Sequence, residues 1–393
     1  MAGELYDVVV VGGGPAGATA AHDLASKGHK VALVDKAGRI KPCGGAIPPR
    51  LMRDFQIPAH LLKARVNCAT MISPSGQRVD MPIQNGFVGM VDRAEYDEWL
   101  RNRAAESGAT RYEGTYERVS RENGHAVVHI AAKGTGAPIE LHTKLIVGAD
   151  GALSKVGRQE VKGGDKTKFV FAYHEIVETP PPEQGDPNRC EIFYDARVSP
   201  DFYAWIFPHG PTMSIGTGSA NKGFSLRDSV AMLRGQEKLD ATKTLRHEGA
   251  PIPLKPLKRW DNGRDVVLAG DAAGVVAPSS GEGIYYAMLG GRLAADAAAE
   301  CLATGDVKAL KLARKRFMKL HGRVFLILGI MQYFWYSSDK RRERFVTMCR
   351  DPDVQRLTWE SYMNKELPKR EPFAQVRVFF KDLAHLLHLT APT

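Results

Sequence analysis

Three glycine-containing motifs, far apart in the chain, have the residue types that hold a phosphorylated dinucleotide. The first places Gly12, Gly14 and Gly17 at a G-x-G-x-x-G spacing, with Pro15 and Ala16 between them. In such a turn the first glycine allows the tight bend and the second lets a pyrophosphate approach the backbone. The third lets the following helix pack against the preceding strand. The start of that helix offers amide N–H groups and a partial positive charge to the phosphates.

The sequence around these glycines predicts the strand–turn–helix–strand order that the spacing requires. An apolar run covers residues 6–11, a helical pattern 16–27 and a second apolar run 31–34. A glycine turn without a ligand accounts for this order less well. Asp35 closes the second run, where a carboxylate binds ribose hydroxyls and repels a 2′-phosphate. With Lys36 beside it, this site is expected to hold FAD or NAD and not NADPH.

Two later motifs favour FAD over NAD. Asp150 follows one apolar run, and Gly270 and Asp271 follow another. Ligands collect at the carboxyl ends of strands in open parallel sheets. We therefore expect both carboxylates at the cofactor, with Asp271 on the flavin-side ribose. Gly281 and Gly283 open a long helical pattern, whose N-terminus is expected to stabilise negative charge on a reduced isoalloxazine ring.

Two further segments resemble the geranylgeranyl reductases, within the flavoprotein superfamily of aromatic hydroxylases and squalene epoxidases. Cys43-Gly44-Gly45 is similar to their Cys-Gly-Gly signature, and residues 203–208 match their Y-x-W-x-F-P motif. The resemblance covers most of residues 4–330. Within the family, residues 38–50 look most like the reductases of chlorophyll and bacteriochlorophyll biosynthesis. Archaeal lipid reductases more often carry a longer glycine run after the cysteine.

The resemblance implies an α/β fold: a Rossmann-type FAD-binding domain, an antiparallel-sheet substrate domain and a helical C-terminal region, as in aromatic hydroxylases. It also implies three successive double-bond reductions of a geranylgeranyl group to phytyl, with FAD and NADPH. The substrate would be (bacterio)chlorophyll or geranylgeranyl diphosphate. No second G-x-G-x-x-G is evident, so NADPH is expected to bind transiently. The alternatives are an aromatic monooxygenase or halogenase, an archaeal-type prenyl lipid reductase, and a prenyl-protein escort without catalytic flavin.

The candidate catalytic residues are Cys43, Tyr203 and Trp205. An isolated alkene accepts hydride only when a proton or strong dipole assists, so Cys43 is either a proton donor or a small packing residue. Tyr203 and Trp205 are expected to share one strand face with Phe207, which suits a long prenyl chain or simply a packed strand. In the family, the arginine that matches Arg93 contacts FAD. The spacing leaves open whether Arg39 and Lys41 meet phosphates or a substrate carboxylate.

The expected domains are discontinuous, because the cofactor motifs are separated by shorter, alternating patterns typical of antiparallel strands. We assign the FAD-binding domain to residues 1–60, 90–165 and 264–305, the substrate domain to 61–89 and 166–263, and a helical region to 306–393.

The charge of the chain is concentrated in the helical region. The net charge is +10, and residues 306–393 hold 18 Lys and Arg against 9 Asp and Glu, a net +9. No nucleic-acid motif accompanies them. Residues 324–336 are apolar and aromatic but too short to span a bilayer. They are predicted to form either a buried core helix or an interfacial helix, with peripheral membrane contact through residues 323–344.

The cysteines argue against a disulfide framework and a metal site. There are five, an odd number, and none forms a C-x-x-C pair. Metal ligands at a usable spacing are also absent. With no secretory signal in residues 1–6, the expected location is the cytoplasm, with or without peripheral contact to an inner or photosynthetic membrane.

Overall fold

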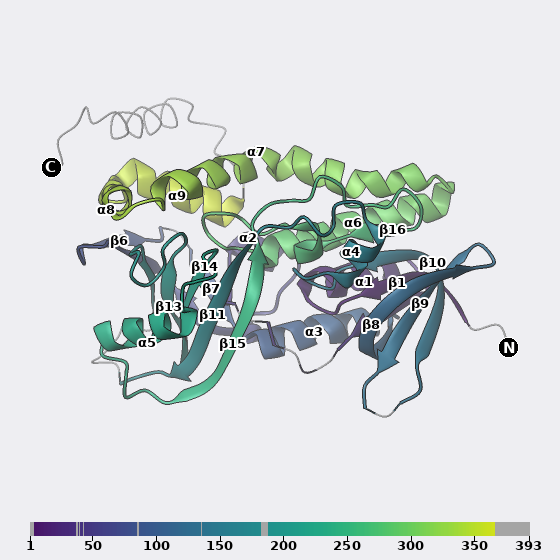
Figure 1. Ribbon diagram of the computed structural model, residues 1–393, viewed down its shortest axis with the longest axis horizontal. Coiled ribbons are helices and arrows are strands. Elements are labelled where there is room, and N and C mark those ends of the chain that lie inside the picture. Colours follow the sequence, from purple (N-terminus) through teal and green to yellow (C-terminus); the bar gives the residue numbers. More distant parts are fainter. Residues whose placement is uncertain are drawn as a thin grey trace. The chain divides into compact units, whose positions relative to one another are not determined.

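The computed structural model describes residues 4–36, 38, 40–41, 43–84, 86–134, 136–181 and 188–365, and Figure 1 labels its helices and strands. The chain forms two compact units. Unit 1 comprises Met1–Lys41, Arg93–Val170 and Pro251–Gly329, and unit 2 comprises Pro42–Asp92, Phe171–Ala250 and Ile330–Thr393.

Unit 1 is built on a six-stranded sheet whose central strands are parallel. Their order is β8 (Thr110–Glu122), β2 (Val31–Asp35), β1 (Leu5–Val11), β10 (Ile139–Gly148) and β16 (Val266–Leu268). β9 (His125–Ala132) pairs antiparallel with β8 and β10. Val8 lies between Val31 and Leu145 in the register. Because β1, β2 and β16 are buried on both faces, these strands are nearly continuous apolar runs.

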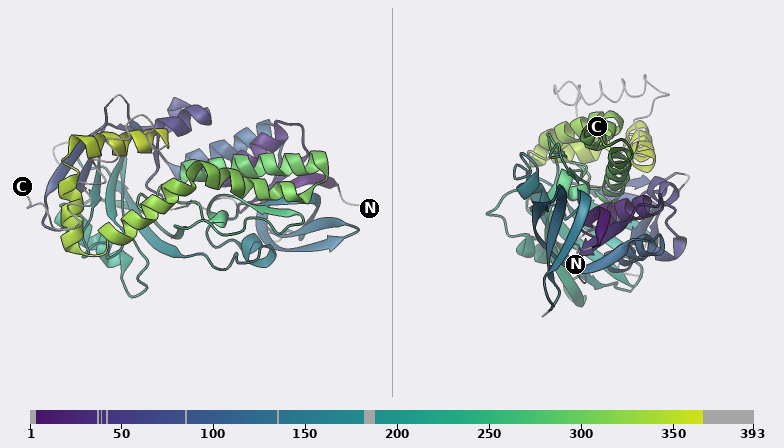
Figure 2. Two further views of the ribbon diagram at one scale, coloured as in Figure 1. Left: turned by 90° about the horizontal axis from the view of Figure 1, so that it is seen from above. Right: turned by 90° about the vertical axis from the view of Figure 1, so that its right-hand side faces the viewer.

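Two helices of this unit pack closely against each other because small residues line their contact. A Cβ on Gly291 would lie 2.1 Å from the carbonyl oxygen of Ala16, so only glycine lets the two helices that carry these residues approach. α7 (Leu312–Trp335) lies alongside α6 (Ile284–Thr304), with the rings of Phe325 and Tyr286 5.0 Å apart (Figure 2). The helices of this unit are α1 (Pro15–Ala25), α3 (Arg93–Glu106), α4 (Lys155–Glu160), α6 (Ile284–Thr304), the first part of α7 (Leu312–Trp335), and the 3-10 helices η3 (Gly270–Ala273) and η4 (Val307–Lys311).

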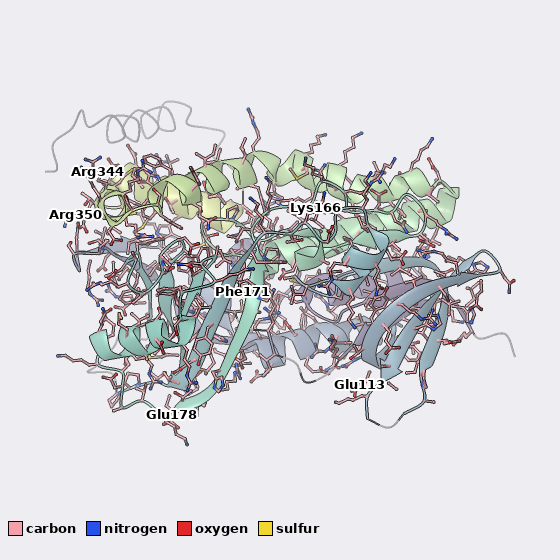
Figure 3. All side chains as sticks on the ribbon, viewed as in Figure 1. Glu113, Lys166, Phe171, Glu178, Arg344 and Arg350 are labelled. Atoms are coloured by element: carbon pink, nitrogen blue, oxygen red, sulfur yellow. The ribbon has the colours of Figure 1, made fainter. Side chains whose placement is uncertain are left out.

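Unit 2 contains a seven-stranded, largely antiparallel sheet and a three-stranded sheet. The large sheet has the order β15 (Thr244–Pro253), β11 (Phe169–Glu178), β14 (Thr212–Ser219), β13 (Ala204–His209), β12 (Arg189–Phe193), β5 (Cys68–Ile72) and β6 (Arg78–Pro82). The small sheet has the order β3 (Ala46–Ile47), β7 (Val88–Val91) and β4 (Leu62–Val66). β11 carries Phe171 near its start and Glu178 at its end (Figure 3).

The helices of unit 2 fasten onto the large sheet through specific contacts. Glu343 accepts hydrogen bonds from the Ser73 and Ser75 hydroxyls, each 2.8 Å long, and Trp359 donates one to the Met81 carbonyl. These contacts join the end of the chain to the β5–β6 hairpin. The helices are α2 (Pro49–Asp54), the 3-10 helix η1 (Ala59–Leu61), α5 (Leu226–Gln236), α8 (Asp339–Met348) and α9 (Pro352–Asn364).

The boundaries of the compact units differ from the predicted domain limits most in two places, with smaller shifts at residues 90–92, 166–170 and 251–263. Residues 43–60, placed with the FAD-binding domain from the sequence, lie in unit 2, and residues 306–329 lie in unit 1. The first difference arises because β3 pairs with β7, and the second because α7 packs on α6. The roles of these units stay predictions. The predicted helical region is helical over α7, α8 and α9, and residues 366–393 lie outside the described residues.

Candidate functional site

The loop between β1 and α1 requires glycine at two positions for packing. Gly12 has a φ of +108°, and a Cβ there would lie 2.3 Å from the carbonyl oxygen of Ala149. A Cβ on Gly17 would lie 1.8 Å from the carbonyl oxygen of Gly12. The loop therefore bends tightly and brings α1 onto the strand end, as the spacing predicts.

Gly14 differs, because among the described residues no atom beyond its own chain neighbours lies within 4 Å of the position of its Cβ. It is the N-cap of α1, Pro15 follows at the first helical position, and no acidic residue or side-chain hydrogen bond caps the first turn. The amide groups of this turn and the absence of a side chain on Gly14 fit an anion that lies directly against the backbone. This is the arrangement that a pyrophosphate needs.

Asp35 lies at this loop and is held by two groups. The amide of Gly13 donates a hydrogen bond of 2.8 Å to its Oδ2, and Arg101 Nη1 lies 3.7 Å from its Oδ1. Arg101 also donates to the Gly13 carbonyl at 3.3 Å. Arg101 was not among the predicted site residues, although it follows Arg93 and Asp97 at intervals of four residues on α3, the spacing of one helix face.

Lys36 and Arg93, which were also predicted to bind the cofactor, differ from each other in exposure. Lys36 is exposed directly after β2. Arg93 is buried and binds Asp97 through two parallel hydrogen bonds of 2.8 and 2.7 Å. Arg39 lies outside the described residues.

The motif at Asp150 joins the glycine loop through the backbone. The Ala149 amide donates to the Val11 carbonyl at 2.8 Å, which links the ends of β10 and β1. The Asp150 carboxylate accepts from the Ser154 hydroxyl and from the Lys155 and Val156 amides. Its partly buried position raises the pKa of this carboxyl. The Asp150 carboxylate thus supports the first turn of α4, whose N-cap is Ser154.

The motif at Gly270 and Asp271 also converges on the start of α1. Gly270 has a positive φ, and a Cβ there would lie 2.6 Å from the Cβ of Ala16. Asp271 is buried and forms an ion pair with Lys41. Lys41 therefore meets a carboxylate of the chain itself, and its contact with a phosphate or a substrate carboxylate stays a prediction.

Gly281 and Gly283 lie in the loop that opens α6. The Gly281 amide donates to the Ala277 carbonyl, and Gly283 is the N-cap of the helix. Glu282 accepts a hydrogen bond of 3.1 Å from the Tyr285 amide. This helix start therefore already carries a carboxylate, which weakens the expected stabilisation of a negative flavin ring.

The residues of unit 1 thus fit FAD. The first turn of α1 and the loop at Gly14 would hold the pyrophosphate, and Asp35 would bind ribose hydroxyls. Unit 1 brings together three of the predicted motifs: Gly12 contacts Ala149, and Ala16 contacts Gly270. Contact of each residue with FAD stays a prediction.

In unit 2, the Cys43 turn packs on β13. A Cβ on Gly44 would lie 2.7 Å from the Phe207 ring and 3.9 Å from Trp205 Nε1. Gly45 has a φ of +73°, and its Cβ would lie 2.5 Å from His209 Nε2. The turn that carries the half-buried Cys43 is therefore fixed against one side of β13.

The aromatic residues that follow one another around β13 are in contact. The Trp205 ring lies 5.9 Å from the Tyr203 ring and 6.2 Å from the Phe207 ring. Tyr203 precedes the strand, which begins at Ala204; the expectation that all three lie on one strand was therefore wrong for Tyr203. Trp205 is buried, whereas Tyr203 and Phe207 are half-buried.

His209 ends this strand in a buried position, with its Nδ1 3.1 Å from the Phe207 carbonyl oxygen. Burial lowers the pKa of His209 to about 4. Near neutral pH it is therefore an uncharged packing residue beside Gly45. Among the residues that the structure describes, no cluster of His, Cys, Asp and Glu is arranged to hold a metal ion.

The chain matches the family model of an FAD binding domain over residues 5–184. It is 58% identical to a geranylgeranyl diphosphate reductase of Rhodobacter capsulatus over 388 residues, which cover 98% of this chain and 99% of that one. It is 35% identical to a protein of the same name from Synechocystis, with 97% of each chain covered. A digeranylgeranylglycerophospholipid reductase of Methanocella arvoryzae is 30% identical over 79% of this chain and 81% of its own.

Solved structures share the fold at lower identity. A geranylgeranyl bacteriochlorophyll reductase-like protein from Thermoplasma acidophilum has a TM-score of 0.81 at 21% identity, covering 94% of this chain and 99% of its own. The flavin-dependent brominase Bmp2 has a TM-score of 0.77 at 18% identity, covering 98% and 100%. The predicted fold class is confirmed. The FAD-binding motif, the Cys-Gly-Gly turn on its aromatic strand and the near full-length similarity agree, and the chain belongs to the geranylgeranyl reductase family of FAD flavoproteins.

Proposed function

We propose that the protein is an NADPH-dependent reductase that converts a geranylgeranyl group to phytyl by reducing its double bonds. The observation that carries this proposal is the 58% identity, over 98% of the chain, to a protein named for reduction of geranylgeranyl diphosphate. The packing of Gly44 on Phe207 and Trp205 supports it, because it places a thiol-bearing turn beside an apolar aromatic surface.

Bound FAD would supply the reducing equivalents, taken from NADPH. Unit 1 would hold it through the first turn of α1 and through Asp35, which is already oriented by Gly13 and Arg101. The same carboxylate would repel the 2′-phosphate of NADPH. NADPH is therefore expected to bind elsewhere and only transiently.

The residues of unit 2 would bind and protonate the substrate. A prenyl double bond is unpolarised, so one carbon must gain a proton as the other gains hydride. Cys43 is the candidate donor, since it is half-buried while the other four cysteines are buried. The faces of Tyr203, Trp205 and Phe207 would bind the apolar chain and stabilise positive charge that develops on the carbon that receives hydride.

The acceptor that carries the geranylgeranyl group is proposed to be (bacterio)chlorophyll or diphosphate, in preference to a glycerol lipid. The test compares initial rates on geranylgeranyl diphosphate, geranylgeranylated bacteriochlorophyll and digeranylgeranylglycerophospholipid with NADPH as donor. We expect one of the first two to be reduced fastest. Faster reduction of the glycerol lipid would contradict the assignment.

We also propose peripheral membrane contact through one face of α7. Five large apolar side chains on this helix are exposed: Leu320, Leu326, Ile327, Ile330 and Tyr333, the last at 86%. The basic residues Lys319 and Arg323 lie on the same exposed face. The opposite face is buried through Phe317, Phe325 and Trp335.

Residues 324–336 were predicted to form either a buried core helix or an interfacial helix. One face of α7 is buried and the other is exposed, so the helix combines features of both. Apolar and aromatic residues flanked by basic ones are typical of a helix that lies in the headgroup region of anionic lipids. Among the described residues, no helix is long and apolar enough to cross a bilayer. A prenylated pigment resides in lipid, so this contact would bring the enzyme to its substrate.

A further inference from the structure

We propose that His174 is a positioning residue that acts through Ser214 to hold the Trp205 indole against the Cys43 turn. All four residues lie in unit 2. The kinetic part of the test rests on the proposed reductase function, whereas the spectroscopic part does not.

The hydrogen bonds between these side chains have one consistent direction. Trp205 Nε1 lies 3.1 Å from the Ser214 hydroxyl, and that hydroxyl lies 2.9 Å from His174 Nδ1. An indole N–H only donates, so Ser214 accepts from Trp205. In a neutral His174 whose Nε2–H donates to Glu248, Nδ1 is an acceptor, and Ser214 donates its own proton to it. The Nε2 of His174 then carries the ring proton. Ser214 and His174 are both buried, so neither hydrogen bond competes with water.

A carboxylate fixes the other side of the histidine ring. His174 Nε2 lies 2.6 Å from Glu248 Oε2, and Glu248 is in turn paired with Arg246 at 3.1 Å. Arg246 also donates to Asp92 at 2.8 Å. An ionised acceptor makes the histidine hydrogen bond stronger and selects the tautomer that leaves Nδ1 free to accept from Ser214.

The sheet brings these residues together by register. His174 on β11 is opposite Gly216 on β14, and Gly216 is opposite Trp205 on β13. A Cβ on Gly216 would lie 2.2 Å from the Trp205 ring and 2.7 Å from the His174 Cβ. The indole therefore lies over a backbone position that has no side chain. The hydrogen bond with Ser214 then fixes the direction of its N–H.

The edge of the indole that bonds to Ser214 also lies near the Cys43 turn. Trp205 Nε1 would lie 3.9 Å from a Cβ on Gly44, and the Gly45 carbonyl accepts a hydrogen bond from the Val91 amide. Val91 directly precedes Asp92, which binds Arg246. The Cys43 turn is therefore held by Trp205 on one side and by β7 on the other.

A double-mutant cycle separates positioning from general support of the sheet. Ser214→Ala in the parent is expected to lower kcat for alkene reduction about fivefold, as loss of one buried hydrogen bond would. In a Trp205→Phe background, which has no indole N–H, the same substitution should have no further effect. His174→Asn, which keeps an acceptor for Ser214, should retain more activity than His174→Ala. An equal loss in both backgrounds would overturn the proposal.

A second readout needs no turnover. The ultraviolet resonance Raman spectrum of the parent minus that of Trp205→Phe isolates the Trp205 indole, whose bands report hydrogen bonding of its N–H. Ser214→Ala and Glu248→Gln should both shift these bands toward a weaker hydrogen bond. Ser219→Ala is the matched control, because Ser219 is also buried on β14 but donates to Asp201. Unshifted bands in both test variants would overturn the proposal.

The two readouts also distinguish this proposal from the proposed function. If the parent reduces no geranylgeranyl substrate while the Raman bands shift as expected, the reductase assignment fails and the positioning of Trp205 stands. If Ser214→Ala does not fold, Glu248→Gln carries both measurements, since Glu248 binds the Nε2 of His174.

Discussion

The amide of Gly13 donates a hydrogen bond of 2.8 Å to the Asp35 carboxylate, and this joins the glycine loop after β1 to the end of β2. The loop and the carboxylate therefore present one surface to a ligand. Within that loop, Gly17 is required by the chain's own packing, whereas the space beside Gly14 is not filled by the chain. The two glycines can be separated by experiment.

Gly14→Ala should leave the fold intact and weaken FAD binding. Gly14 has a φ of −74°, which alanine adopts freely, and in the part of the chain that the structure describes only its chain neighbours lie within 4 Å of the new Cβ. We expect the melting temperature of the apoprotein to be unchanged, and the Kd for FAD, from quenching of flavin fluorescence, to rise at least about tenfold. Gly17→Ala should instead destabilise the apoprotein by about 3 kcal/mol or more, because its Cβ would overlap the Gly12 carbonyl. A Gly14→Ala protein with unaltered FAD affinity would contradict this assignment.

The elements that carry this loop were predictable, because their signals are local. The apolar runs at β1 and β2 and the glycine spacing between them predict the strand–turn–helix unit directly. Arg101 was not predicted to act, since its contact with Asp35 depends on how α3 packs. The hydrogen-bond partners of His174 could not be predicted from the sequence for a similar reason. Glu248 is 74 residues away, and only strand register brings the two together.

The two motifs of the resemblance were predicted separately, and their contact was not. No spacing rule relates Gly44 to Phe207, because the turn and the strand are joined by folding of unit 2 alone. The cofactor motifs differ in this respect. Strand ends of a parallel sheet meet at one edge, so their convergence follows from topology.

Cys43→Ala should slow alkene reduction at least about tenfold while leaving flavin reduction by NADPH unchanged. Of the two reactions, only alkene reduction needs a proton donor. Stopped-flow absorbance at the flavin band and product analysis measure the two steps separately. Cys68→Ala is the control, since Cys68 is buried on β5. Equal alkene-reduction rates in Cys43→Ala and the parent would remove Cys43 from the mechanism.

The buried His209 should make the protein less stable in mild acid. Burial lowers its pKa from 6.5 to about 4 in the folded chain. Below about pH 6.5 the unfolded chain therefore binds a proton that the folded chain excludes, and the free energy of unfolding falls as the pH drops toward 4. The full effect of this residue is about 3 kcal/mol.

Chemical denaturation between pH 7 and pH 4 tests this expectation. His209→Gln should lose less stability over this range than the parent, while His60→Gln, at an exposed position, should follow the parent. Parallel curves for His209→Gln and the parent would show that His209 does not set this dependence.

The exposed face of α7 should bind anionic bilayers. We expect the protein to co-sediment with phosphatidylglycerol vesicles and Leu326→Gln/Ile330→Gln to bind at least about tenfold more weakly, because apolar burial in the headgroup region is lost. Met232→Gln is the control, as Met232 is a similarly exposed apolar residue on α5. Failure of the parent to sediment, or an altered oligomeric state in the α7 variant alone, would assign this face to another partner.

The central claim is that this flavoprotein adds hydrogen to prenyl double bonds. The most direct measurement is the product mass after incubation of the FAD-loaded protein with NADPH and a geranylgeranyl substrate in the absence of oxygen. We predict stepwise gains of two hydrogens and no added oxygen. An unchanged substrate mass under these conditions, or a product that forms only with oxygen, would contradict it.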